Sequence, residues 1–400
     1  MKFLYKAVTK EGKSIQGVID AKDAQEVASY LRTHDFFPVT ITQKKDKNVN
    51  KLIQFFTRSK PSIQFFTRQI AMMLLSGLTF VDALRILEEQ AQNEATREFT
   101  TGIVADIEGG KSFSQAIARY PELFSPVYVA LIKAAETTGL LDKILFRLAD
   151  NLEKQQKLKS TIKSALLYPA IVILGMVVVV IIMMLFVVPQ LSVVYVSLNV
   201  ALPLSTRIIV GMSNVFIVFW PFMLGFLALF IFLFRQWHKT ESGKLIFDDV
   251  ILRLPVFGKL IQKTILAQST STLSLLIGAG TLVVEALQQT AGTMGNVLYK
   301  NAILSVAEQV EKGVSVGDAL GGYTVFPPIL VQMAKIGEQT GKLDESFLRV
   351  SEYFEQEVDQ LTKTLQTAME PFIIVILGLG VAFLIFSIIT PIYSLTSAIH

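Results

Sequence analysis

The sequence has no cysteine and only three histidines among its 400 residues. Without cysteine, disulfide bonds and thiolate metal sites are excluded. The histidines, His34, His238 and His400, are too far apart in the sequence to predict a metal site or a proton relay. Charge is also scarce, since 18% of the residues are charged and 52% are hydrophobic. We expect no cofactor. The chain is also more apolar than a soluble protein of this length requires.

Three segments contain no Asp, Glu, Lys or Arg, namely residues 166–188, 208–234 and 371–392. As an α-helix, each would cross about 30 Å or more of hydrocarbon. The sequence therefore predicts three membrane-spanning helices. Ion and proton carriers usually place an ionisable residue inside the membrane, and these segments have none. This argues against the alternative that the chain is a transporter.

The basic residues predict the orientation. Of the 37, only Arg207 lies between the first two spans, and none follows the third. Because Lys and Arg are retained on the cytoplasmic side, we expect a cytoplasmic N-terminus, a periplasmic loop at 189–207 and a periplasmic C-terminus at 393–400. The segment before residue 166 has 24 basic and 18 acidic residues, a net charge of +6, and residues 235–370 have 12 and 15, a net charge of −3. Either these are ordinary solvated surfaces, or the two parts meet different partners.

The first 43 residues alternate between apolar and polar types around Gly12 and then change to helical spacing. This pattern predicts a small cytoplasmic α/β module with two strands, a helix and a third strand. Residues 44–61, which begin with the polar run KKDKNVNK at 44–51, are a predicted linker. The hexapeptide IQFFTR occurs at 53–58 and again at 63–68, a duplication for which we have no physical account.

A longer internal repeat follows. SGLTFVDAL at residues 76–84 corresponds to AGTLVVEAL at 279–287, an offset of 203 residues. The same offset pairs the turn glycines Gly77 and Gly110 with Gly280 and Gly313. Since two membrane crossings separate the copies, both lie on the cytoplasmic side. The expected fold class is mainly α, a polytopic membrane protein with helical-bundle repeats at 62–165 and 235–370 beside the α/β module.

Residues 105–112 read ADIEGGKS, which fits the loosest form of a phosphate-binding P-loop. The second copy has Val314 where Lys111 stands, and the residues before 105 have the spacing of a helix rather than of a buried strand. Gly110 is better explained as a left-handed helix end, and Ser112 as the N-cap of the next helix. An intrinsic membrane ATPase that depends on Lys111 is the alternative to test.

The motif AETTGLLD at 135–142 recurs as GEQTGKLD at 337–344, at an offset of 202 residues. It predicts a helix that ends at Gly139 or Gly341, then a helix with Asp142 or Asp344 in its first turn. The alternative for the acidic residues is a site for a hard cation, although two carboxylates are few for one. The candidate partner-coupling residues of the motif are Glu136, Gly139, Asp142, Glu338, Gly341 and Asp344.

From this motif, helical spacing continues without a breaker into the first and third spans. Pro169 and Pro371 lie where these helices enter the membrane. Each proline removes a hydrogen bond to the carbonyl four residues before it and so favours a kink. The kinks either aim the spans or act as levers that carry cytoplasmic motion into the bilayer.

Several runs carry a family resemblance, namely FTRQIAMMLLSGLTFVDAL, IEGGKSFSQAI, IKSALLYPAIV, VVPQLSVVYVSLNVALPLSTR, GEQTGKLD and EPFIIVILGLGVAFLIFSIITPIYSL. Together they resemble the inner-membrane platform protein of type IV pilus and type II secretion machines over nearly the whole chain. The resemblance implies a non-enzymatic platform in the bacterial inner membrane that forms small homo-oligomers. It also implies contact with a cytoplasmic hexameric ATPase, with pilins or pseudopilins, with other inner-membrane components and with lipid, but not with nucleic acid.

The resemblance does not separate the two machines, so pilus assembly and secretion stay open. This sequence also departs from the family pattern at two places. Ala135 stands where the second copy has Gly337, and the FTRQ run of the first copy is replaced by AQST at 267–270. The two copies are therefore not expected to bind the same partner in the same way.

Overall fold

The computed structural model describes residues 2–9, 14–21, 24–33, 36–43, 61–91, 93–190, 193 and 204–399. The chain divides into two compact units, Met1–Pro61 with Gln92–Arg97, and Ser62–Ala91 with Glu98–His400. The first IQFFTR copy, residues 44–60 of the predicted linker and most of the predicted periplasmic loop lie outside the described residues.

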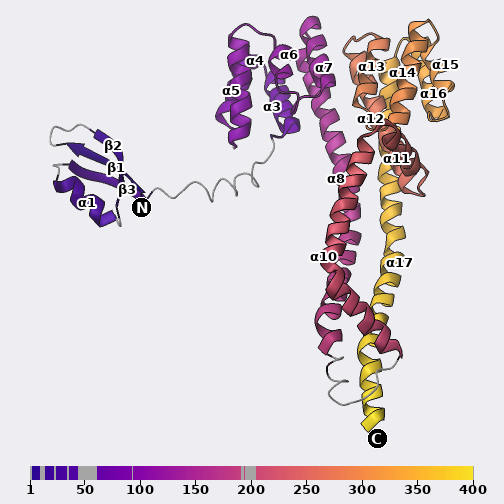
Figure 1. The fold of residues 1–400 in the computed structure, drawn as a ribbon. Helices are drawn as coiled ribbons and strands as arrows, with labels where there is room; N and C mark the ends of the chain where they lie inside the picture. The colour runs from indigo at the N-terminus through magenta and orange to yellow at the C-terminus, as the bar shows by residue number, and fades with distance from the viewer. Residues whose placement is uncertain are drawn as a thin grey trace. The chain divides into compact units, whose positions relative to one another are not determined.

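The N-terminal unit is a small α/β fold with the expected elements in the expected order (Figure 1). Strands β1 (Lys2–Thr9), β2 (Ser14–Asp20) and β3 (Phe36–Gln43) form an antiparallel sheet in the order β2-β1-β3. Pro38 is tolerated because β3 is an edge strand. Helix α1 (Ala24–Thr33) buries Val27 and Leu31 against Ile19 and Phe36.

The second unit begins with a bundle of short helices, here called the first lobe. Phe66 on α3, Phe99 on α5 and Phe124 before α7 form its aromatic core, with ring centroids 5.2 to 6.2 Å apart. The hydroxyls of Thr67 and Tyr128 pair within this core at 2.9 Å. The helices of the first lobe are α3 (Ile63–Leu75), α4 (Phe80–Glu89), α5 (Glu94–Glu108), α6 (Phe113–Ala118), α7 (Pro126–Thr138) and the first part of α8 (Leu141–Ile182).

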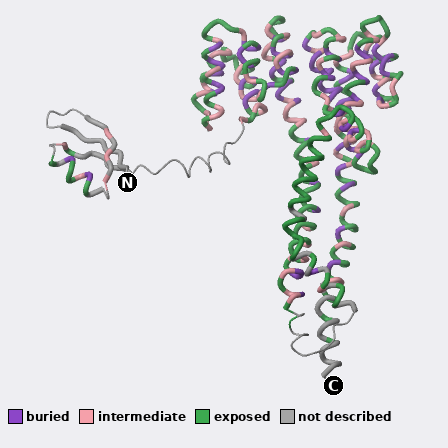
Figure 2. The backbone as a smooth tube through the Cα atoms, in the orientation of Figure 1, coloured by how far each residue is buried: buried purple, intermediate pink, exposed green. Residues whose placement is uncertain are grey.

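A second lobe repeats this arrangement, and both lobes share one continuous apolar core. Its helices are α12 (Phe257–Gly278), α13 (Val283–Thr293), α14 (Val297–Glu311), α15 (Val316–Gly321), α16 (Pro328–Thr340) and the first part of α17 (Leu343–Ile399). Between the lobes in sequence come a π-helical turn η1 (Met183–Val187), α10 (Leu204–Lys239) and α11 (Glu241–Arg253). The buried residues concentrate in the two lobes (Figure 2).

Three helices are long and apolar enough to cross a membrane, and they lie in α8 with its continuation, α10 and α17. Large apolar side chains on them are exposed, including Leu174 at 64%, Phe222 at 72% and Phe386 at 69%. Lipid would cover these side chains. Both α8 and α17 run without interruption from a lobe into a span, through Pro169 and Pro371 respectively. Helix α17 also reaches Ile399, so the segment expected as a C-terminal tail is helical over its described residues.

Candidate coupling site at the junction of the two lobes

The two copies of the recurring motif adopt the same backbone turn. Helix α7 ends at Gly139, with φ 69°, and α16 ends at Gly341, also with φ 69°. The next amide closes each turn, because Leu140 N–H donates to the Ala135 carbonyl at 3.1 Å and Lys342 N–H donates to the Gly337 carbonyl at 2.8 Å. Left-handed backbone of this kind favours glycine.

Glu136 caps a different helix from its own. Its carboxylate accepts hydrogen bonds from Phe113 N–H at 2.5 Å, Ser114 N–H at 3.3 Å and the Ser114 hydroxyl at 2.5 Å, all at the start of α6. The first amides of a helix have no partner within it, and the negative charge also suits the helix dipole. The carboxylate therefore holds α6 against α7.

Glu338 has the corresponding role in the second lobe. It accepts from Val316 N–H at 3.0 Å and Gly317 N–H at 3.3 Å, at the start of α15. The sequence showed that both glutamates recur, but it did not show which amides they bind, because the paired residues are 21 to 23 positions apart.

The other acidic residues of the motif lie apart from these caps. Asp142 and Asp344 lie in the first turns of α8 and α17. A Cβ atom at Gly278 would lie 2.9 Å from the guanidinium of Arg147 and 3.3 Å from the carboxylate of Asp344, so both side chains lie beside the end of α12. Among the described residues, no group of three or more His, Asp or Glu side chains could hold a metal ion.

The segment that resembles a P-loop is a helix end. Helix α5 precedes it, where a nucleotide-binding loop requires a strand. Gly110 has φ 86°, and Lys111 N–H donates to the Asp106 carbonyl at 3.0 Å to close the turn. Ser112 caps α6 by accepting from Gln115 N–H. The other three turn glycines share this backbone, with φ values of 88° at Gly77, 89° at Gly280 and 89° at Gly313.

The side chain of Lys111 is also occupied. Its ammonium lies 2.8 Å from one carboxylate oxygen of Asp106, and Arg119 binds the other oxygen. The hydrogen bonds from Lys111 and Arg119 hold the pKa of Asp106 below its usual value. Lys111 thus serves as an internal ion-pair partner in the first lobe.

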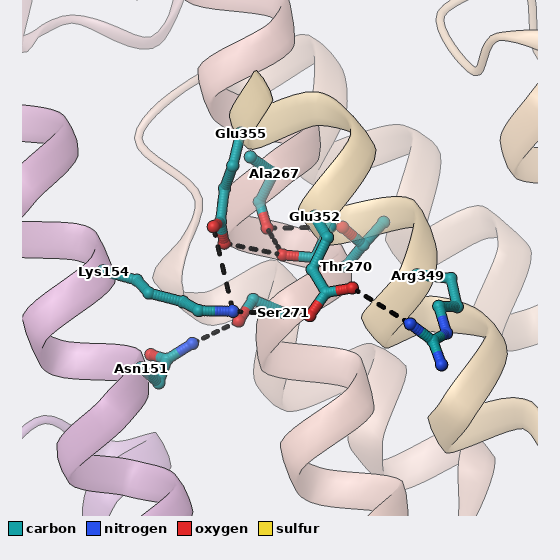
Figure 3. A network of polar contacts seen from close by, with 9 residues as sticks. Asn151, Lys154, Ala267, Thr270, Ser271, Arg349, Glu352 and Glu355 are labelled. Atoms are coloured by element: carbon teal, nitrogen blue, oxygen red, sulfur yellow. Dashed lines mark hydrogen bonds and ion pairs between the residues drawn. The ribbon is translucent and has the colours of Figure 1, made fainter. Parts of the chain in front are cut away.

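Polar side chains join the two lobes where α8, α12 and α17 meet (Figure 3). Asn151 on α8 donates to the Ser271 hydroxyl on α12. The Lys154 ammonium on α8 lies 3.7 Å from Glu352 and 3.9 Å from Glu355, both on α17. The hydroxyl of Ser351 links α17 to α12 by donating to the Ala267 carbonyl at 3.1 Å. We call the six residues whose side chains make these contacts the polar junction, namely Asn151, Lys154, Ser271, Ser351, Glu352 and Glu355.

The polar junction is loosely packed. One cavity of about 270 Å³ lies between α7, α8, α12 and the end of α13, and another of about 240 Å³ is lined by residues that include Asn151, Lys154, Ser271 and Glu352. Burial raises the pKa of Glu355 above its usual value, with Lys154 opposing the shift. The junction therefore combines polar contacts with open space, beside the continuous apolar core that the two lobes share.

The sequence did not reveal the polar junction. Asn151 and Lys154 lie on a helix face that reads as solvated, and STST at 269–272 reads as an ordinary polar helix segment. The sequence did not predict that Lys154 on α8 pairs with Glu352 and Glu355 on α17, because these residues are about 200 positions apart. The repeat alone indicated that α8 and α17 are equivalent helices.

The chain matches one protein family twice, in agreement with the internal repeat. The profile described as type II secretion system (T2SS), protein F, matches residues 66–189 and again residues 269–391. Its N-terminal domain matches residues 1–42. The chain belongs to the type II secretion system protein F family. The two matched segments of the family profile contain the two lobes' motifs and the first and third spans.

Relatives in this protein F family serve two kinds of machine. The chain is 35% identical to type IV pilus assembly protein PilC of Thermus thermophilus, over 98% of each chain. It is 34% identical to type IV pilus assembly protein TapC of Aeromonas hydrophila, over 98% of this chain and 95% of the relative. Type II secretion system protein F of Vibrio cholerae is 27% identical over 99% of this chain and 98% of its own.

Proposed function

We propose that this chain is the non-enzymatic inner-membrane platform of a type IV pilus machine. It couples a cytoplasmic hexameric assembly ATPase to the insertion of pilins into the filament. The supporting observation is that similarity is higher to pilus assembly proteins, at 32 to 35% identity, than to secretion proteins F, at 27 to 29%. The platform of a type II secretion system is the second candidate, because those relatives also match along the full chain.

Continuous helices support a mechanical role. Rigid α8 and α17 would carry a displacement of either lobe into the bilayer, with Pro169 and Pro371 as the points of bending. The caps at Glu136 and Glu338 hold α6 to α7 and α15 to α16, next to the starts of these two long helices. The distribution of basic residues supports a cytoplasmic N-terminus and a periplasmic C-terminus.

The excess of basic residues in the first half of the chain lies outside the first lobe. Residues 62–165 contain 12 basic and 12 acidic residues, so the excess of the first half belongs to residues 1–61. An acidic surface on a partner would therefore be drawn to the N-terminal unit. The net charge of the first lobe is zero, so it gives no reason for the first lobe to bind an acidic partner.

Deletion of the gene tests the proposal. We expect the deletion strain to lack surface filaments by electron microscopy while its secretion of folded exoproteins is unchanged, with both measured against the complemented strain. Loss of secretion with normal filaments would instead assign the chain to a secretion system. Normal filaments together with normal secretion would reject the platform function.

Nucleotide binding tests the enzymatic alternative. The purified full chain should bind no ATP, and Lys111→Ala should change nothing, because Lys111 is paired with Asp106. Binding that is lost in Lys111→Ala would favour an intrinsic ATPase. Solute uptake into proteoliposomes that contain the chain would favour the transporter.

A further inference from the structure

The contact between the two lobes is asymmetric. The first lobe uses α7 and α8, and the second lobe uses α12 and α13, in addition to the packing of α8 along α17. Helices α3 and α4 are the first-lobe equivalents of α12 and α13, and α16 and α17 are the second-lobe equivalents of α7 and α8. Within the described part of the chain, α3 and α4 make no comparable contact with α16 or α17. The lobes therefore pack head to tail, and each retains one unused face.

The unused face of the first lobe is apolar. At the lobe contact, α12 buries Thr272 and Leu275, which are 8% and 9% exposed. The repeat offset of 203 residues makes Met72 the equivalent of Leu275, yet Met72 is 54% exposed. Phe65 and Leu75 on the same side of α3 are 61% and 54% exposed. We call Phe65, Met72 and Leu75 the open α3 face.

The unused face of the second lobe is apolar as well. On the first lobe, Val127 of α7 and Asn151 of α8 are covered, at 8% and 7% exposed. At the offset of 202 residues their equivalents are Ile329 and Tyr353, which are 38% and 42% exposed. Ile336 on α16 is a further exposed apolar side chain, at 51%. We call Ile329, Ile336 and Tyr353 the open α16/α17 face.

These two open faces are the repeat-related copies of two faces that already bind each other within the chain. We propose that copies of this protein assemble head to tail, with the open α3 face of one copy packed against the open α16/α17 face of the next. The partner is a second copy of the chain, because a second copy carries the repeat-related complement of each open face. The six named side chains are uncharged, and the charged neighbours Arg68 and Arg349 already have carboxylate partners, so the pairing removes apolar surface from water without burying an unpaired charge.

The membrane fixes the direction of growth. Helices α8 and α17 both descend from their lobes toward the spans (Figure 1). The rotation that relates the two lobes therefore has its axis along the membrane normal. Repeating this rotation keeps every further lobe on the same side of the bilayer, and a head-to-tail contact gives a ring where its rotation closes. These two faces would form the homo-oligomer expected of the proposed platform, in a pilus machine or a secretion machine alike.

Cysteine crosslinking tests the pairing directly, since the natural chain has no cysteine. Gly278 and Arg147 are neighbours at the lobe contact, and their equivalents across copies are Leu75 and Arg349. Both equivalents are exposed, so substitution should leave the fold intact. In liposomes, we expect Leu75→Cys/Arg349→Cys to give a ladder of covalent multimers with a short bismaleimide. A pair of Leu75→Cys with Lys312→Cys should give none.

The single variants distinguish head-to-tail from two-fold packing. Each single variant alone should stay monomeric on a denaturing gel, and the two single variants reconstituted together should stop at dimers. Crosslinking of Leu75→Cys to itself would show a two-fold interface and overturn the proposal. Absence of a ladder from the double variant would overturn it as well.

A second variant removes the contact without crosslinking. Met72→Glu places a charge in the open α3 face and should convert the oligomer to monomers in mass photometry, with the helical circular dichroism unchanged. Leu282→Glu, at a side chain 75% exposed on a turn of the second lobe, is the matched control and should leave the oligomer intact. An oligomer that survives Met72→Glu would refute the pairing. Filament loss in the deletion strain is independent of both results, so the platform function would stand.

Discussion

Replacing Glu136 with alanine should loosen α6 more than any other part of the first lobe. The carboxylate is the acceptor for two backbone amides and one hydroxyl at the start of this helix of six residues. In the alanine variant, the first two amides of α6 lose this partner in a half-buried place. Ser112 caps only the third amide, at Gln115, so it cannot replace the carboxylate.

The size of the effect follows from the contacts. A hydrogen bond to a charged group contributes about 1.5 to 3 kcal/mol, and the helix dipole adds a few tenths. We take about 2 kcal/mol for the local opening of α6, which corresponds to about 30-fold faster amide exchange. Glu338→Ala should cost less, about 1.5 kcal/mol or about 10-fold, because Gly317 offers no hydroxyl where Ser114 does.

Hydrogen exchange read by mass spectrometry on the purified full chain measures this opening. Peptides covering α6 should exchange faster in Glu136→Ala, and peptides covering α15 should not. Glu122→Ala, which removes an exposed acid of the same lobe, is the control and should leave α6 unchanged. Equal protection of α6 in the parent and in Glu136→Ala would refute the capping argument.

Three further results are expected. Pro169→Ala and Pro371→Ala should reduce filament number while protein abundance and ATPase co-purification stay normal, and unchanged filaments in both would remove the lever. Asp106→Asn should flatten the acid side of the stability curve. Because the pKa of Asp106 is lower in the folded state, its carboxylate stabilises the lobe at pH values above the unfolded pKa of about 4. This stabilisation is lost as the pH falls through the folded pKa, and measuring unfolding at several pH values would show the loss. Gly139→Ala should cost about 1 kcal/mol of thermal stability from backbone strain alone, because the space around it is open, and a neutral result would contradict the left-handed turn.

Local signals in the sequence determined much of this fold. Charge-free stretches identified the membrane helices, because a lipid environment excludes charge whatever the tertiary structure is. Glycines that recur at the repeat offset identified the helix ends, since left-handed backbone depends on the residue itself. Helical spacing without a breaker predicted the continuity of α8 and α17. The family resemblance depended on the same recurring runs.

Only the tertiary structure decided which groups meet. The carboxylate of Glu136 could have faced solvent or a cation, and its binding to the α6 amides depends on how α7 packs beside α6. The pairing of Lys154 with Glu352, and the open faces left on α3 and α16, depend on the relative placement of the two lobes. Sequence periodicity reports which side of a helix is apolar, but the partner of that side is set by packing between segments about 200 residues apart.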